Sequence, residues 1–461
     1  MRLARATNFY RSIFRISLPT AFSSLVSFLV VVADDIMVSS ITNGVTEGYG
    51  KIAQAAVSQV NALTAFFTAT LLGLVSGSSV LISQYWGKKD MPRIKRLFSI
   101  VFAVSMAVTL LFVLAARLFP EPVIRLVLRA GDESAAEATR LALAYFAIVC
   151  FSWIPYAVTN SLTGMLRSVE VVRVTLYVSV VSLVMNISLN YVLIFGKLGL
   201  PAMGVEGATV LTRVIEMLIV AFYTFRVQKV VDVRPRDFFT FDRALARDYA
   251  RYGLPVGLTD MQWSFIGLLK AAIIGRLTTY FIAANAITSA MMNLGTMFTF
   301  ALAGGACVMV GKAVGRGDYD TAREYSRTIQ VMFALIGVCM AAVVYLLRAP
   351  FTRLYGSAQD AQVFSLATQM IAIGAVTLIG TSYHASCFVG INRGAGDSRF
   401  VAAVDMICGW LVVLPAMLIA VHFNWPLPVV FLMTRIDQCF KWLIAFLRLR
   451  GDKWIKNVTR A

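Results

Sequence analysis

The 461-residue chain is 59% hydrophobic and only 14% charged, and its formal net charge is +18. Because a soluble domain is roughly half apolar and a quarter charged, this composition excludes an ordinary soluble protein and indicates a membrane protein. The sequence also lacks a P-loop, an HExxH motif and a CxxC pair. We therefore expect neither an ATP-driven pump nor an enzyme, and no cofactor.

Apolar segments of about 20 residues recur along the chain, and each is long enough to cross a hydrocarbon core as a helix. A β-barrel would need alternating polar and apolar residues, which are not seen, so we predict an all-α integral membrane protein. By this length rule we expect about twelve membrane-spanning helices. Their predicted centres lie near Leu25, Thr68, Val108, Ile148, Ser182, Val214, Leu268, Phe298, Gly337, Gly374, Leu411 and Met433.

Lysine and arginine residues are concentrated in every second loop between these segments. The basic groups include the N-terminus, the loop 87–96, the stretch 226–251 and the tail 441–460. Because cytoplasmic loops carry an excess of Lys and Arg, we expect a multi-pass protein of the cytoplasmic membrane with both termini in the cytoplasm. The positive charge then reflects membrane topology, and no nucleic-acid partner is expected.

The sequence repeats weakly on the two sides of its longest charged stretch, residues 225–253. RISLPTAF (15–22) resembles RYGLPVGL (251–258), QYWGKKD (84–90) resembles KAVGRGD (312–318), and GMLRSVEVVR (164–173) resembles GINRGAGDSR (390–399), in the same order and at nearly one spacing. These matches predict two pseudo-symmetric six-helix bundles, residues 1–226 and 251–461, joined by a cytoplasmic linker, 227–250. The second bundle ends in a short basic cytoplasmic tail. An even number of helices per bundle makes the repeats parallel, as in one class of transporters.

Seven stretches, taken in chain order, resemble the multidrug and toxic compound extrusion (MATE) family of transporters. They are SLPTAFSSLVSFLVVVADDIMV, SGSSVLISQYWGKKD, GMLRSVEVVRVTLYVSVVSLVMNISLNYVLIFG, GLPAMGVEGATVLTRVIEML, GLPVGLTDMQWSF, GRGDYDTAREYSRTI and GINRGAGDSRF. The resemblance implies a twelve-span antiporter that exports lipophilic, often cationic, compounds in exchange for H⁺ or Na⁺. We expect a monomer whose partners are such small molecules and the bilayer. The wider superfamily also contains flippases, so a flippase for a lipid-linked precursor is the alternative.

Two adjacent carboxylates, Asp34 and Asp35, lie near the end of the first apolar segment. On a helix Asp34 falls on one stripe with Pro19, Ser23 and Ser27, whereas Asp35 lies at its margin. Placing an ionisable residue inside a span costs free energy, so such a residue is expected to have a function or a charged or polar partner. The family resemblance makes Asp34, three residues before a methionine, the coupling carboxylate that binds and releases a cation. The alternative is an acid at the helix end that water solvates from outside.

Further polar residues could complete a cation site in the first half. Asn186 and Asn190 are four residues apart and share one helical face. By the family resemblance the set would be Asp34, Asn186, Asn190 and Thr212, which could hold Na⁺ at Asp34. Asn190 departs from the pattern because relatives often carry Asp there, and one fewer negative charge weakens a hard-cation site. Both H⁺ and Na⁺ therefore stay open, and the asparagines could instead form interhelical hydrogen bonds.

Other ionisable residues inside the predicted spans are candidates for binding sites or for ion pairs. Asp260, like Asp35, is a candidate second acidic or substrate-cation site, or else it pairs with a basic residue such as Arg435 or Lys270. Arg213 and Glu216 are three residues apart and are expected to form a structural ion pair. In the last span Arg435 and Asp437 do not face each other, so each needs a partner on another helix. His384 is expected to be a packing residue.

Overall fold

A computed structural model describes residues 7–39, 49–125, 133–194, 204–354 and 361–460 of the chain. Within these ranges the regular structure is entirely helical, which confirms the all-α prediction. The helices before the linker are α1 (Thr7–Ser39), α2 (Tyr49–Lys88), α3 (Met91–Leu118), α4 (Pro120–Arg125), α5 (Glu133–Val149), α6 (Trp153–Ser168), α7 (Arg173–Ile194) and α8 (Gly204–Phe222). The linker holds the short helix α9 (Arg243–Asp248).

The helices after the linker are α10 (Leu254–Ile274), α11 (Thr279–Gly315), α12 (Tyr319–Leu354), α13 (Ala361–Ala385), α14 (Ser398–Ile407), α15 (Leu414–His422), α16 (Leu427–Met433) and α17 (Lys441–Leu449). Short π-helical or 3₁₀ turns join α5 to α6 and α14 to α15, and they interrupt the last span between α16 and α17. Every predicted span centre lies in one of the helices or in a turn that joins two of them.

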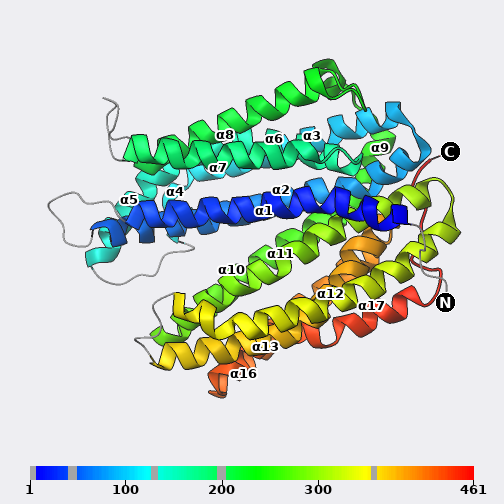
Figure 1. Ribbon diagram of the computed structural model, residues 1–461. Helices are drawn as coiled ribbons and strands as arrows, with labels where there is room; N and C mark the ends of the chain where they lie inside the picture. Colours follow the sequence, from blue (N-terminus) through cyan, green and yellow to red (C-terminus); the bar gives the residue numbers. More distant parts are fainter. Residues whose placement is uncertain (1–6, 40–48, 126–132, 195–203, 355–360, 461) are drawn as a thin grey trace.

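Nine helical segments in the described ranges are long and apolar enough to cross a membrane. The other predicted spans are α8, which begins at the edge of a described range, α10, which carries Asp260 and Lys270, and the last span, which is broken. Figure 1 shows the helices running side by side along one direction, with the first half (blue to green) beside the second half (green to red). The fold is thus a membrane-embedded pair of helical bundles.

Helices of the two halves approach each other most closely through glycines. A Cβ atom on Gly315 of α11 would overlap the carbonyl oxygen of Gln84 on α2, and one on Gly87 of α2 would overlap the carbonyl oxygen of Lys312 on α11. The sequence repeat aligns Gly87 with Gly315, and it aligns Gln84 with Lys312 at the same spacing. The α2–α11 crossing therefore obeys the pseudo-two-fold symmetry that the repeat predicts.

We expect Gly315→Ala and Gly304→Ala to change stability in opposite directions, although both residues belong to α11. The Gly315 substitution forces a methyl group against the backbone of α2 and should lower stability by about 1–3 kcal/mol. Gly304 has open space where a Cβ would lie, so its substitution should raise stability by about 0.5–1 kcal/mol through helix propensity. Thermal unfolding of the purified variants measures both effects. A similar shift for the two variants would contradict the tight crossing.

The two halves are also tied together at the end of the molecule that holds both termini, α9 and residues 451–460, which we call the termini end. The backbone N–H of Val458 donates to Gln84 Oε1 at 2.9 Å, and Gln84 Nε2 donates to the carbonyl oxygen of Gly394 in the second half at 3.1 Å. Arg460 pairs with Asp248 of the linker at 2.5 Å. The tail thus contacts the first half and the linker, and Gln84 of the first half contacts the second half.

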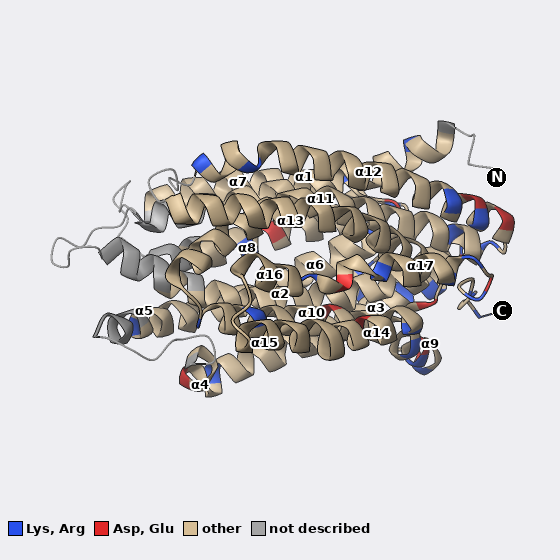
Figure 2. Ribbon diagram, turned by 90° about the horizontal axis from the view of Figure 1, so that it is seen from below, with Lys and Arg blue, Asp and Glu red and all other residues tan. Residues whose placement is uncertain are grey.

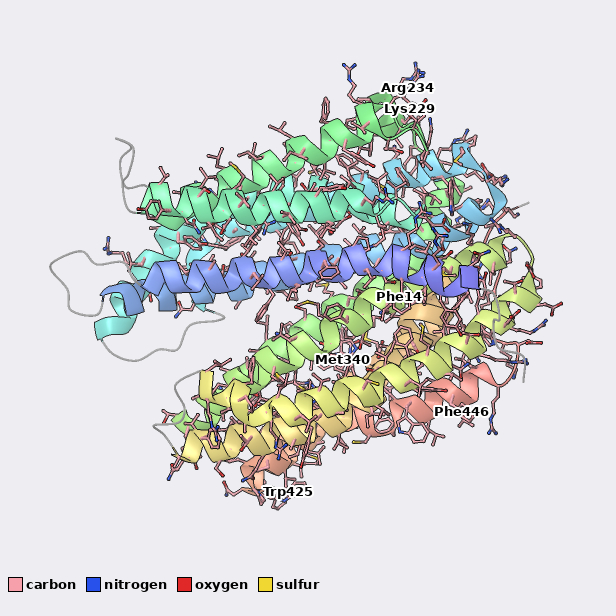
Figure 3. The ribbon with its side chains drawn as sticks, in the orientation of Figure 1. Phe14, Lys229, Arg234, Met340, Trp425 and Phe446 are labelled. Carbon is pink, nitrogen blue, oxygen red and sulfur yellow. The ribbon has the colours of Figure 1, made fainter. Side chains whose placement is uncertain are left out.

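The termini end is also where charge is concentrated. Lys and Arg gather there together with several acidic residues, whereas the helices beyond it are mostly uncharged (Figure 2). Lys229 and Arg234 of the linker project at the same end (Figure 3). From this end α1 and α2 diverge from α10 toward the opposite end of the molecule (Figure 1). The closest contacts between the halves and the charged surface therefore lie at one end.

Candidate functional site

The first candidate site lies along the face of α1 that packs against α7. Ser23 Oγ lies 2.5 Å from Ser179 Oγ on α7, and Ser27 Oγ donates to the carbonyl oxygen of Ser23 at 3.0 Å. The predicted serine stripe of α1 therefore faces the helix that carries the two asparagines. The helix continues through Asp34 and Asp35 to Ser39, but the side chains of both aspartates lie outside the described residues.

The predicted neutral members of this site are deeply buried. Asn186, Asn190 and Thr212 expose only 3%, 0% and 4% of their surface, so bulk water does not solvate them. Asn190 Nδ2 donates to Asn186 Oδ1 at 3.3 Å within α7, and Thr212 lies on α8, which packs against α7. Amide and hydroxyl oxygens are ligands that Na⁺ and other hard cations accept. The structure brings the two asparagines together and places Thr212 on the adjacent helix.

Arg213 and Glu216 form an ion pair on α8, with Arg213 Nη1 2.8 Å from Glu216 Oε2. Ser182 of α7 also donates to Glu216, and the Arg213 guanidinium lies 5.2 Å from the ring centroid of Tyr156 on α6. The pair therefore connects three helices of the first half. Because both charges have partners, their arrangement favours the structural role expected from their spacing.

Asp260 pairs with Arg393, rather than with Arg435 or Lys270. Arg393 Nη2 lies 2.8 Å from Asp260 Oδ1, and Ser76 of α2 donates to Asp260 Oδ2 at 3.3 Å. A Cβ atom on Gly73 of α2 would lie 2.8 Å from the Cβ atom of Asp260, so the carboxylate sits on the α2–α10 crossing. The Asp260 side chain thus links α10 to Arg393, which follows the tenth predicted span (361–392), and to α2 of the other half.

A second group of charges, which we call the C-half charge cluster, consists of Asp405, Asp437 and Lys441. Lys441 Nζ lies 2.7 Å from Asp405 Oδ1 and 3.0 Å from Asp437 Oδ2. The ammonium also lies 4.3 Å from the ring centroid of Trp263 on α10. The expectation that Asp437 needs a partner on another helix is corrected, because Lys441 is four residues further along the same span. That i, i+4 spacing was the sequence signal for the pair.

Two basic side chains near this cluster bind polar uncharged groups. Lys270 Nζ donates to the carbonyl oxygen of Thr434 at 2.7 Å, and Arg435 Nε donates to Thr377 Oγ1 at 3.0 Å. The Thr434 carbonyl is available because the last span leaves α-helical geometry after Met433. The break in the last span therefore lies beside fixed positive charge, in an arrangement that resembles the discontinuous helices of transporter binding sites.

His384 is buried beside the same break. Its Nε2 atom lies 2.6 Å from Gln438 Oε1, which also accepts a hydrogen bond from Thr381 at 2.9 Å. Gln438 Nε2 in turn donates to Asp437 Oδ2 at 2.8 Å. Gln438 thus links the histidine to the C-half charge cluster, a connection that sequence reasoning missed because α13 and the last span meet only in the folded protein.

Comparison with known protein families gives one family match. The MatE family profile matches residues 19–192 and 255–419 of this chain. A probable multidrug resistance protein NorM from Halalkalibacterium halodurans is 27% identical over 365 residues, which cover 77% of this chain and 76% of that protein. A probable multidrug resistance protein NorM from Bradyrhizobium diazoefficiens is 25% identical over 416 residues, which cover 88% of this chain and 86% of that protein.

Solved structures share the fold at lower sequence identity. A multidrug resistance MATE family transporter of the MOP superfamily in an outward-facing conformation superposes with a TM-score of 0.84 at 20% identity, covering 98% of this chain and 96% of that one. A MATE crystal structure in complex with MaL6 superposes with a TM-score of 0.82 at 21% identity, covering 95% of each chain. At these identities the superpositions show a common fold.

Proposed function

Because this chain belongs to the MatE family of membrane transporters, we propose that it exports lipophilic, often cationic, compounds across the cytoplasmic membrane in exchange for H⁺ or Na⁺. The relatives named as multidrug resistance proteins support the class of substrate. We further propose a monomer with residues 1–226 and 251–461 as its two bundles, the linker 227–250 between them, and both termini in the cytoplasm. The basic surface of the termini end supports this orientation (Figure 2).

One observation carries the coupling proposal: the serine stripe of α1 that leads to Asp34 packs on α7, which holds buried Asn186 and Asn190. A carboxylate at position 34 would then add the charge that the neutral oxygens of Asn186, Asn190 and Thr212 lack. We assign cation exchange to Asp34. We assign no such role to Asp35, which lies at the margin of the α1 stripe. Asp260 is a weaker candidate for a second site because Arg393 already neutralises it.

The proposed cycle uses the cation to bias two conformations. With the termini end in the cytoplasm, the glycine crossing and the tail would close the cytoplasmic side, and these contacts support an outward-facing state. Cation binding at Asp34 would alter the packing of α1 around Pro19 and favour one state. A shift from 1:99 to 99:1 requires a preference of about 5.5 kcal/mol, which desolvation of a carboxylate can supply.

The flippase alternative receives less support from the arrangement of basic side chains. A pyrophosphate-bearing substrate would call for a basic cavity, and Arg213 is already paired with Glu216. Lys270 and Arg435, whose partners are uncharged, are the remaining candidates that sequence analysis named. We therefore keep export of small amphiphiles as the proposed function.

The test is efflux of a cationic dye from proteoliposomes under an imposed Na⁺ gradient and, separately, an imposed pH gradient. We expect one of the two gradients to drive dye movement and protein-free liposomes to show none. That result names the coupling ion. If neither gradient drives dye transport while a fluorescent lipid-linked pyrophosphate is translocated, the flippase alternative replaces the proposal.

A further inference from the structure

The C-half charge cluster has the composition of a cation site that is already filled. Asp405 lies on α14 and Asp437 in the 3₁₀ turn Ile436–Cys439, and the Lys441 ammonium lies between their carboxylates. The exposed fractions of the Lys441, Asp437 and Asp405 side chains are 1%, 1% and 9%. The Trp263 ring covers the ammonium from α10 at 4.3 Å. The ammonium therefore contacts carboxylate oxygens and an aromatic face and is shielded from water.

Two carboxylates buried together require a positive charge, because an uncompensated charge in a membrane interior is strongly unfavourable. A mobile Na⁺ could supply that charge through oxygen ligands. In this chain the charge is supplied by a side chain that cannot leave. A covalently attached cation compensates one of the two negative charges in every conformation that keeps Lys441 between the carboxylates, so its presence there does not respond to an ion gradient.

The sequence repeat places a second fixed charge in the same half. The repeat aligns Pro19 with Pro255, and counting along both helices from these prolines aligns Asp34 with Lys270. Lys270 therefore occupies the position in α10 that corresponds to Asp34 in α1. Its Nζ donates to the Thr434 carbonyl at the break of the last span and lies 5.7 Å from the Trp263 ring centroid. The second half thus has an ammonium where the first half has its proposed coupling carboxylate.

We propose that Lys441 is a built-in cation that permanently fills a dicarboxylate site in the second half, so that exchange of the coupling ion is confined to the first half. This inference rests on the proposed function, because it concerns where the coupling ion binds. Lys441 then acts as a fixed counter-ion for Asp405 and Asp437 in place of a mobile cation. Removing the ammonium should convert the site into one that binds a free monovalent cation.

The test compares Asp34→Asn with the double variant Asp34→Asn/Lys441→Ala. The first-half site then lacks its coupling carboxylate in both proteins. Thermal unfolding is measured at about pH 8.5, because Na⁺ must displace protons from carboxylate ligands and therefore binds more tightly as the pH rises. Raising Na⁺ at constant ionic strength, with choline as the replacement ion, should increase the unfolding temperature of the double variant by about 2–4 °C. The single variant should show no Na⁺-specific shift.

Two further variants separate a cation site from a general loss of structure. In the Asp34→Asn background, Lys441→Arg keeps the charge and should remain insensitive to Na⁺. Adding Asp437→Asn to the double variant removes one ligand and should abolish the Na⁺ shift. A folded double variant without a Na⁺-specific shift would overturn the proposal, as would a shift that persists after Asp437 is neutralised.

The two proposals fail in different ways. If Na⁺ still stabilises Asp34→Asn alone, the assignment of Asp34 is at fault, whereas an insensitive double variant refutes only the role of Lys441. Should the double variant fail to fold, cation uptake into proteoliposomes decides the matter. Asp34→Asn alone should then show no substrate-driven Na⁺ or H⁺ flux, and residual flux would place a working cation site elsewhere.

Discussion

Asp34→Asn is expected to reduce gradient-driven dye efflux by about 100-fold or more while leaving the folded protein intact. An asparagine cannot bind and release H⁺, and it removes the negative charge that would hold Na⁺, so the cation no longer distinguishes the two conformations. The measurement is dye efflux from proteoliposomes driven by whichever gradient the wild-type protein uses. Yield and unfolding temperature of the purified variant establish that it folds.

The neighbouring carboxylate provides the matched control. Asp35→Asn removes the same charge one residue later, at the margin of the α1 stripe, and should retain most of the transport rate. The Ser23–Ser179 contact supports this distinction, because it turns the stripe toward α7. Wild-type transport in Asp34→Asn, or equal losses in both variants, would refute the assignment.

Asp260→Asn is expected to lower stability by about 2–3 kcal/mol, near the low end for breaking a buried ion pair, because Asp260 is itself partly exposed. The substitution leaves the Arg393 guanidinium, whose side chain is only 8% exposed, without its carboxylate. The Asp260→Asn/Arg393→Met variant removes the stranded charge and should recover most of the lost stability. Thermal unfolding of the three proteins measures the difference.

Transport by the same variants separates a structural role from a second site. If Asp260 only neutralises Arg393, the double variant should transport dye at close to the wild-type rate. If Asp260 binds substrate or the coupling ion, transport should stay low even though stability is recovered. The second result would make Asp260 a functional site and would contradict a purely structural role for its ion pair with Arg393.

Sequence patterns predicted the features that depend on periodicity along the chain. The apolar segments indicated the spans, helix geometry predicted the serine stripe of α1, and the spacing of the repeat reappears in the symmetric contacts of Gly87 and Gly315. The i, i+3 spacing of Arg213 and Glu216 likewise matches their ion pair. Each of these features involves residues on one helix or related by the repeat.

The partners that sequence analysis missed are those that depend on how helices meet. Arg393 reaches Asp260 because α10 and the end of the tenth span converge on α2, which no spacing in the chain encodes. Asp405 meets Lys441 only because α14 packs near the broken last span. The i, i+4 spacing of Asp437 and Lys441 does indicate their ion pair, although the span is not one continuous α-helix there.

The two halves share a fold but differ in how they carry charge. In the site proposed for the first half, Asp34 would join the neutral Asn186, Asn190 and Thr212, whereas the second half holds Lys270 and Lys441 beside Trp263. In this account a mobile cation serves the first half and fixed ammonium groups serve the second. Because of this asymmetry, binding of one cation would change the conformation through the first half only, although the two halves have the same fold.

The most direct test of cation exchange at Asp34 is substrate-induced release of the bound cation from purified protein in nanodiscs. Because competing ligands are reciprocally linked, a saturating cationic dye should release about one H⁺ or Na⁺ per wild-type protein and none from Asp34→Asn. A pH indicator or a Na⁺ electrode reads the release, and Asp35→Asn should behave like the wild type. Dye binding without any cation release from the wild type, or equal release from Asp34→Asn, would contradict the account.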